Sequence, residues 1–162
     1  MFSIRRLQLL LVLLCTIFFC SGAFGQSAAD VKVSGDASPD KIKRGGATRG
    51  SVVIEIPSGL HIQSSRPLDK FLVATKLELT APSGVRIGPV SYPRARVVKL
   101  KFSKSAVAVY EGRAVLRFRI ALTPSFGGGS AEIKGKLRFQ ACNDEACFPP
   151  VTRDVSVWVN LQ

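Results

Sequence analysis

Two cysteines, Cys142 and Cys147, have four residues between them in the stretch RFQACNDEACFPPVTRD, residues 138–154. A disulfide between them would either hold a turn together or be opened and closed by exchange with the thiols of other proteins. The intervening Asn143 and Asp144 favour a turn, which brings the two α-carbons within the roughly 4.4–6.8 Å that a disulfide requires. The function of the chain depends on which role the pair has.

The residues around the pair leave both roles open. Pro149 and Pro150 donate no backbone hydrogen bonds, so the segment after Cys147 is expected at a sheet edge or a bulge, where another backbone can approach. Closing a loop of about six residues constrains the unfolded chain by only about 2 kcal/mol. Exported domains nevertheless often carry structural disulfides. A structural staple and a redox pair therefore remain equally open from these residues.

The strand expected before the pair predicts where Cys142 points. In EIKGKLRFQAC, side chains alternate between two faces. The apolar face holds Ile133, Leu137, Phe139 and Ala141, and the other face holds Lys134, Lys136, Arg138, Gln140 and Cys142. If this period continues to the end of the strand, Cys142 points away from the core.

The first residues predict export. In MFSIRRLQLLLVLLCTIFFCSGAFGQ, two arginines precede an apolar run, and small residues follow at the positions that a signal peptidase reads. We expect residues 1–25 to be a signal peptide, cleaved between Gly25 and Gln26. A permanent anchor is disfavoured because the apolar run is shorter than the roughly 20 residues of a spanning helix. Lipidation at Cys20 is disfavoured because the bulky Phe19 precedes it.

The charge of the chain is strongly basic, with a formal net charge of +12. An exported protein rarely meets nucleic acid, and the basic residues are dispersed, alternating with apolar residues as on the solvated faces of strands. We therefore expect no nucleic-acid partner, and read the charge as a soluble face that attracts acidic proteins.

Metal and hydrolytic chemistry are also disfavoured. After cleavage the chain would keep one histidine, His61, and two cysteines that lie too close together to complete a zinc site without other ligands. His61 stands at an apparent strand start in SGLHIQS and is expected to be structural. We expect no metal site and no cofactor.

Short alternating runs separated by turn signals predict an all-β protein, and an immunoglobulin-like antiparallel β-sandwich is the expected fold. The runs are SVVIEI, KFLVATKLELT, RVVKLKF, AVLRFRIAL, AEIKGKLRFQA and DVSVWVNL. One domain over residues 49–162 is expected, preceded by a ragged segment, 26–48, with a strand at DVKVSG and a loop. FGGGS, residues 126–130, is expected to be a flexible hairpin connection.

The run FQACNDEACFPPVTRDVSV resembles the N-terminal periplasmic domain of the thiol:disulfide interchange protein DsbD, in which an aromatic residue and two prolines follow the cysteine pair. The resemblance covers roughly residues 49–161, with support from GLHIQSSRPLDKFLVATKLELTAPSGV and YPRARVVKLKFSKSAVAVYEGRAVLRFRI. It implies a periplasmic thiol-disulfide oxidoreductase that relays electrons, in which Cys147 forms mixed disulfides with partners and Cys142 resolves them. The spacer NDEA has four residues, where the best-known member has five.

The resemblance also implies partners and a cap. The partners would be thioredoxin-fold proteins, of the disulfide isomerase or cytochrome c maturation type. Since the sequence ends at Gln162, the electron donor is expected to be a separate membrane protein, and the domain a monomer.

By position the loop LKFSKSAVAVYEGR would place Phe102 over the disulfide, without the family's acidic neighbours. Phe102 also shares a face with Val98 and Leu100, so ordinary core packing is the alternative. For the whole domain, the alternative function is a non-catalytic binding or accessory module with a structural hairpin disulfide.

Overall fold

Alternation of apolar and polar residues forms the long strands where the sequence predicts them. In strand β9 (Arg113–Leu122) and strand β10 (Ser130–Phe139), every second residue is buried from the second position to the last. Side chains of successive strand residues point to opposite faces, so each strand turns one apolar face inward. The polar residues between them lie on the outer faces.

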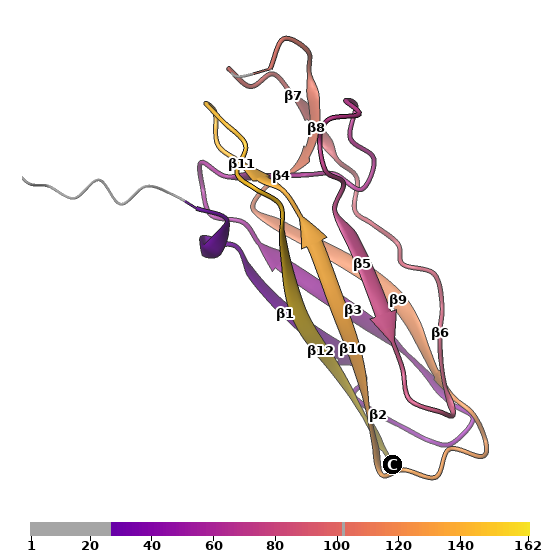
Figure 1. Ribbon diagram of the computed structural model, residues 1–162. Coiled ribbons are helices and arrows are strands. Elements are labelled where there is room, and N and C mark those ends of the chain that lie inside the picture. The colour runs from indigo at the N-terminus through magenta and orange to yellow at the C-terminus, as the bar shows by residue number, and fades with distance from the viewer. Residues whose placement is uncertain (1–26, 102) are drawn as a thin grey trace, which may run out of the picture.

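The structure is a computed structural model and describes residues 27–101 and 103–162, shown in Figure 1. This part of the chain contains one short 3-10 helix, η1 (Ala28–Asp30), and is otherwise built from strands and loops. The remaining strands are β1 (Lys32–Ser38), β2 (Lys41–Ile42), β3 (Ala47–Glu55), β4 (His61–Gln63), β5 (Lys76–Thr80), β6 (Val85–Ile87), β7 (Arg96–Val98), β8 (Val107–Tyr110), β11 (Ala141–Cys142) and β12 (Val151–Leu161). Within the described residues, no helix is long and apolar enough to cross a membrane.

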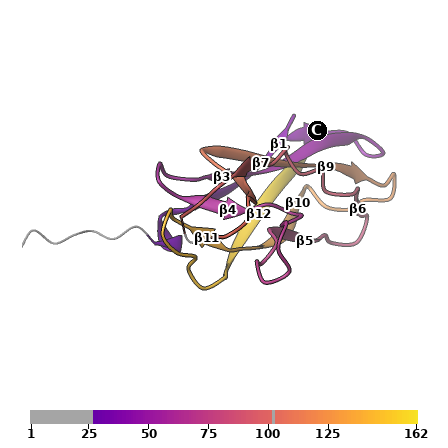
Figure 2. The same cartoon turned by 90° about the horizontal axis from the view of Figure 1, so that it is seen from above.

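Two four-stranded sheets form a sandwich (Figures 1 and 2). One has the order β1-β3-β9-β6 and the other the order β2-β12-β10-β5, and all pairs are antiparallel except the short β2–β12 pair. Buried side chains from both sheets belong to one hydrophobic cluster, for example Leu116 of β9 and Leu137 of β10. The predicted fold class, an all-β immunoglobulin-like sandwich, is confirmed.

At one edge the two sheets approach so closely that a side chain would not fit. A Cβ atom on Gly35 of β1 would lie 2.3 Å from the backbone oxygen of Ser156 in β12. Only glycine permits such a close approach of backbones. The segment 26–48, expected to hold a ragged strand and a loop, thus contributes a full strand, which also pairs over its whole length with β3.

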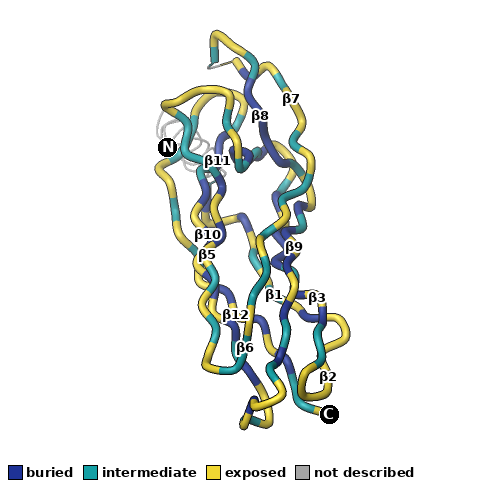
Figure 3. Tube along the Cα trace, turned by 90° about the vertical axis from the view of Figure 1, so that its right-hand side faces the viewer, coloured by how far each residue is buried: buried dark blue, intermediate teal, exposed yellow. Residues whose placement is uncertain are grey.

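A third, smaller sheet lies at the end of the sandwich opposite the C-terminus (Figure 1). Its order is β11-β4-β8-β7, so β11, which ends at Cys142, is an edge strand. All four residues of β8 are buried, as the dark tube at this end of Figure 3 shows. A second hydrophobic cluster of Leu100, Val107 and Val109 supports the small sheet. The cysteine pair is therefore held by this sheet and not by the long strands of the sandwich.

Two details differ from the prediction, and one lies outside the described residues. The predicted hairpin connection, residues 126–130, joins β9 to β10, which begins at Ser130. These strands belong to different sheets, so the connection crosses the sandwich and does not close a hairpin. In the run 70–80, only residues from Lys76 onward form a strand, because β10 pairs with Lys76–Thr80 alone. The predicted signal peptide, residues 1–25, lies outside the described part.

Candidate functional site

Cys142 and Cys147 form a disulfide across a tight hairpin. The two residues face each other as an antiparallel bridge with their α-carbons 3.9 Å apart. Backbone hydrogen bonds flank the bridge, from Asn143 N to Ala146 O at 2.9 Å and from Phe148 N to Ala141 O at 2.8 Å. Cys142 and Cys147 are therefore a non-hydrogen-bonded pair of the antiparallel ladder. At such pairs the two strands come closest together. The distance between the α-carbons is below the roughly 4.4–6.8 Å expected for a disulfide.

The turn between the cysteines is fixed by Asn143, as the sequence predicts. The side-chain oxygen of Asn143 accepts hydrogen bonds from the backbone nitrogens of Glu145, at 2.9 Å, and Ala146, at 2.8 Å. Asparagine side chains commonly close turns in this way. The spacer therefore positions the two sulfur atoms by its own local hydrogen bonds.

Cys142, predicted to point away from the core, belongs to neither hydrophobic cluster, whereas Ala141 before it belongs to the cluster of the sandwich. Cys142 is nevertheless closed to solvent. Its exposed fraction is 0%, whereas Cys147 is partly exposed. β10 ends at Phe139, and the chain then pairs with a different strand, Ala141 opposite Ile62 and Cys142 opposite His61. This change of partner buries the adjacent residues Ala141 and Cys142 together.

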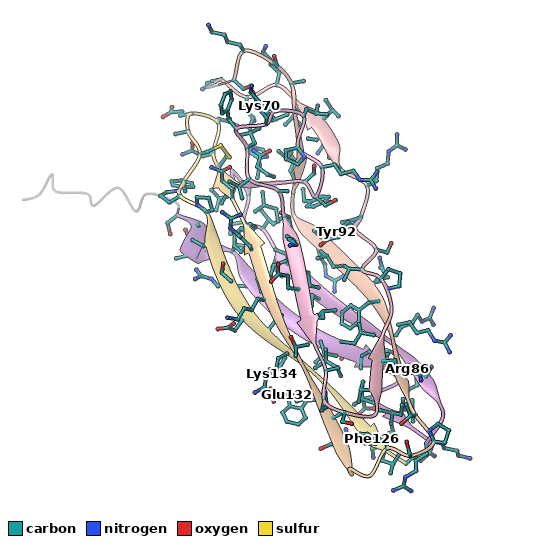
Figure 4. The ribbon with its side chains drawn as sticks, turned by 45° about the vertical axis from the view of Figure 1, so that its right-hand side comes forward. Lys70, Arg86, Tyr92, Phe126, Glu132 and Lys134 are labelled. Carbon is teal, nitrogen blue, oxygen red and sulfur yellow. A yellow bond between two sulfur atoms is a disulfide. The ribbon has the colours of Figure 1, made fainter. Side chains whose placement is uncertain are left out.

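The expected edge position of the return segment is confirmed. Residues 148–150 belong to no strand, and β12 begins only at Val151. Cys147 meets β11 through its bridge to Cys142, and β11 is itself the edge strand of the small sheet. Of the two sulfur atoms, the one on Cys147 lies farther toward the outside of the fold. In Figure 4 the disulfide appears as a yellow bond at the end of the molecule near Lys70, far from Phe126.

A glutamine that sequence reasoning missed lies beneath the disulfide. Gln63 is 0% exposed, and its Nε2 donates to Cys142 Sγ at 3.3 Å, with Cys147 Sγ at 4.0 Å. Within residues 27–101 and 103–162, its Oε1 has no hydrogen-bond partner. A buried acceptor left unpaired costs about 1–3 kcal/mol, so its presence needs an explanation. The only signal in the sequence was a polar residue following Ile62 in a short apolar run.

The backbone of Gln63 is held independently of its side chain. Its N–H donates to Gln140 O at 3.0 Å, and its carbonyl accepts a short hydrogen bond from the hydroxyl of Thr75. Gln140 also fixes two neighbouring loops, because its Oε1 accepts from Val73 N at 2.9 Å and its Nε2 donates to Phe148 O at 3.3 Å. The amide of Gln63 therefore meets the sulfur atoms from a fixed backbone.

His61 opens strand β4, as predicted, and ties the hairpin to the small sheet. Its Nδ1 lies 2.9 Å from Glu111 Oε1 and its Nε2 lies 3.3 Å from Asp144 Oδ1. Arg96 also makes a short contact with Glu111, so charged side chains run from β7 to the tip of the hairpin. In this structure the contacts of His61 are those of a structural residue.

Phe102, the predicted cap, lies outside the described residues. The residue before it is attached to the hairpin, because Lys101 N donates to Asp144 O at 3.0 Å. Leu100 is buried in the small hydrophobic cluster beside Val107 and Val109. The chain on the N-terminal side of Phe102 thus reaches the turn between the cysteines. In the described part of the chain, no group of three or more His, Cys, Asp or Glu side chains is arranged to hold a metal ion.

Solved structures with similarity to this chain are distant. The N-terminal domain of DsbD from Neisseria meningitidis, in its reduced form, is 19% identical, with 68% of this chain and 77% of that one covered and a TM-score of 0.44. The N-terminal periplasmic domain of ScsB from Proteus mirabilis is 14% identical, with a TM-score of 0.47, and the match covers 80% of this chain but 45% of that one. A type I cohesin from Pseudobacteroides cellulosolvens is 7% identical, with 80% and 92% covered and a TM-score of 0.44. No curated protein matches the sequence.

The family comparison covers most of the chain. Residues 30–158 match the family described as "Thiol:disulfide interchange protein DsbD, N-terminal". The matched range includes both cysteines, the prolines after them and every strand of the sandwich except the last residues of β12. Membership associates the chain with thiol-disulfide interchange, as the resemblance of the cysteine segment indicated. The chain belongs to the family of the N-terminal domain of DsbD.

Proposed function

We propose that this chain is an exported thiol-disulfide exchange domain that passes reducing equivalents between thioredoxin-fold proteins through the Cys142–Cys147 pair. The observation that carries the proposal is the unequal exposure of the two cysteines. Cys147 is partly exposed at the open edge of the hairpin, whereas Cys142 is fully buried. Exchange depends on which sulfur an attacking thiolate can reach. Cys147 is therefore the exchange cysteine and Cys142 the resolving cysteine.

Exchange proceeds in two displacements. A thiolate of the reduced donor attacks Cys147 Sγ, the S–S bond breaks, and Cys142 leaves as a thiolate. The donor's second thiolate then attacks its own sulfur in the mixed disulfide, which releases Cys147 and leaves the donor oxidised. Two electrons have passed to this domain, and the two thiolates take up protons. The same steps in reverse reduce an acceptor disulfide.

Family membership and the sequence of the chain support the cellular setting of the proposal. Residues 1–25 carry the pattern of a signal peptide with cleavage before Gln26. Export would then bring the segment 26–48 and the domain 49–162 to the periplasm. Disulfide isomerases and cytochrome c maturation factors with a thioredoxin fold are the proposed acceptors. Phe102 is the proposed cap, since Lys101 beside it is bound to the hairpin.

The proposal is tested by trapping the mixed disulfide with a thioredoxin-fold protein supplied in its disulfide form, so that the Cys147 thiolate attacks the S–S bond of the partner. In Cys142→Ser, Cys147 has no resolving partner, so a covalent complex should accumulate and dissociate on addition of dithiothreitol. The matched control is Cys147→Ser, which leaves only the buried thiol and should trap little. Equal trapping by both variants would contradict the assigned roles, and no trapping by either under matched redox conditions would overturn the proposal.

The burial of Cys142 gives a second candidate some support. A fully buried sulfur is typical of a structural disulfide, and a non-catalytic binding or accessory module would need the pair only to pin its hairpin. Mild reductant followed by alkylation and mass measurement separates the two functions. Labelling of both cysteines without denaturant favours exchange, and labelling only after unfolding favours the accessory module.

A further inference from the structure

We infer that Gln63 takes part in thiol-disulfide exchange: its amide N–H stabilises the Cys142 thiolate as that sulfur leaves, and its carbonyl receives the thiol hydrogen after protonation. The inference rests on the proposed function of the cysteine pair. It assigns a role to the one buried side chain of the described part whose polar atom has no partner.

The geometry places the side-chain amide of Gln63 closer to the leaving sulfur than to the attacked one. Its Nε2 lies 3.3 Å from Cys142 Sγ and 4.0 Å from Cys147 Sγ. Both Gln63 and Cys142 are 0% exposed, so no water competes for this contact. When a thiolate attacks Cys147, the electron pair of the broken S–S bond moves to Cys142 Sγ, beside the amide. A hydrogen bond to a charged acceptor is stronger than one to a neutral sulfur.

The unpaired carbonyl explains why an amide suits this position in more than one redox state. A disulfide sulfur and a thiolate have no hydrogen to donate, so they face the N–H of the amide while Oε1 stays unpaired. A thiol does have a hydrogen to donate. Rotation of the amide about its last bond brings Oε1 to Cys142, where it accepts the S–H. One side chain thus offers a partner to the disulfide, the thiolate and the thiol.

A purely space-filling role does not explain this arrangement. An apolar side chain of the same size would fill the site without an unpaired oxygen, and native cores pair almost all buried polar atoms. The backbone of Gln63 is held by Gln140 and Thr75, so the side chain is not needed to keep β4 in register. The contact with the sulfur atoms is the only interaction found for the Gln63 amide among the described residues.

The test is the proton affinity of Cys142 with and without the amide. In the Cys147→Ser background, Cys142 is the only thiol of the described domain, and its thiolate absorbs in the ultraviolet as the pH rises. Gln63→Met keeps the length of the side chain but removes the donor. In this variant the Cys142 sulfur should bind its proton about tenfold or more tightly, because the thiolate form loses the hydrogen bond from the Gln63 amide. The other charged groups near the pair stay in place in every variant: His61, Lys101, Glu111, Asp144 and Glu145.

Two further variants keep the test decisive. Gln140→Met removes a neighbouring amide that binds backbone groups and no sulfur, so it should leave the proton affinity of Cys142 unchanged even if it lowers stability. Gln63→Glu keeps the shape but replaces the donor with an acceptor, and should raise the proton affinity at least as far as Gln63→Met. It also serves if Gln63→Met fails to fold. With both cysteines present, the Gln63 variants should be reduced by dithiothreitol more slowly than the parent, because a more basic thiol leaves more slowly.

The outcomes separate the inference from the proposed function. A Cys142 proton affinity within about twofold of the parent in both Gln63 variants overturns the inference, and an equal change in Gln140→Met overturns it as well, because the effect would then be structural. If Cys142→Ser still traps a thioredoxin-fold partner in those cases, the proposed function stands without the role of Gln63. If trapping fails while the proton affinity shifts as expected, the proposed function fails and the contact between amide and thiolate remains.

Discussion

Reduction of the Cys142–Cys147 disulfide should leave the sandwich folded, at a cost of about 2 kcal/mol in the free energy of unfolding. The bond joins residues with a sequence separation of 5. For a closed loop of about six residues, the loop-entropy relation gives about 2 kcal/mol near 25 °C. A domain of this size typically has a net stability of about 5–15 kcal/mol. The reduced form should therefore remain mostly folded, as a relay requires.

The position of the pair supports this small value. Neither hydrophobic cluster includes Cys142. The turn between the cysteines is closed by the Asn143 side chain, and Asp144 is bound by Lys101 and His61. These interactions do not require the S–S bond. A buried thiol at Cys142 would also pack as a small apolar side chain.

Urea unfolding, followed by far-ultraviolet circular dichroism in oxidising and reducing buffers, measures the cost. The two transitions should have the same slope, with the midpoint shifted by about 2 kcal/mol divided by that slope. A double variant, Cys142→Ala with Cys147→Ala, is the control, and its midpoint should not depend on the buffer. Loss of the cooperative transition on reduction, or a cost above about 5 kcal/mol, would refute the reasoning.

Three further outcomes are expected. Leu137→Ala should lower the stability by about 2–5 kcal/mol, whereas Lys136→Ala on the outer face should change it by less than about 0.5 kcal/mol; similar values for both would contradict the assigned faces. Phe102→Ala should speed reduction of the disulfide by small thiols with little change in midpoint if Phe102 is a cap, while an unchanged rate with a loss of about 3–5 kcal/mol would identify a core residue. Equilibration with glutathione or dithiothreitol should place the reduction potential of the Cys142–Cys147 pair between roughly −270 and −120 mV; a value below about −300 mV would indicate a structural disulfide.

The long strands were predictable because burial on one face leaves a visible period of two. Residues 113–122 and 130–139 show this period over their whole length, and the structure follows it. Strands of two or three residues, such as β4 and β11, are too short to show any period. The segment 70–75 shows the opposite problem. Its apolar residues resemble a strand, but β10 begins to pair only at Lys76.

The candidate site was predictable as far as local chemistry determines it. The side chain of Asn143 closes the turn, and the segment with the two prolines forms no strand. Both features were predictable because they depend only on these residues and their neighbours in the sequence. The burial of Cys142 and the contact made by Gln63 depend on β4 lying beside β11. Nothing in the residues near either position encodes that distant pairing. The burial of Cys142 after the change of partner that follows Phe139 was therefore not predicted, and Gln63 was missed.

This same change of partner bears on the proposal that a partner thiolate attacks Cys147. In an exchange reaction the incoming sulfur approaches along the extension of the S–S bond, on the side opposite the leaving sulfur. Approach to Cys142 would have to come from the side of β4, the strand that pairs with β11, and Cys142 is 0% exposed. Approach to Cys147 comes from the outer edge of the hairpin, where residues 148–150 form no strand. The sheet switch at Gln140 leaves Cys142 buried beside β4 and Cys147 partly exposed, and this difference supports the separate roles proposed for the two cysteines.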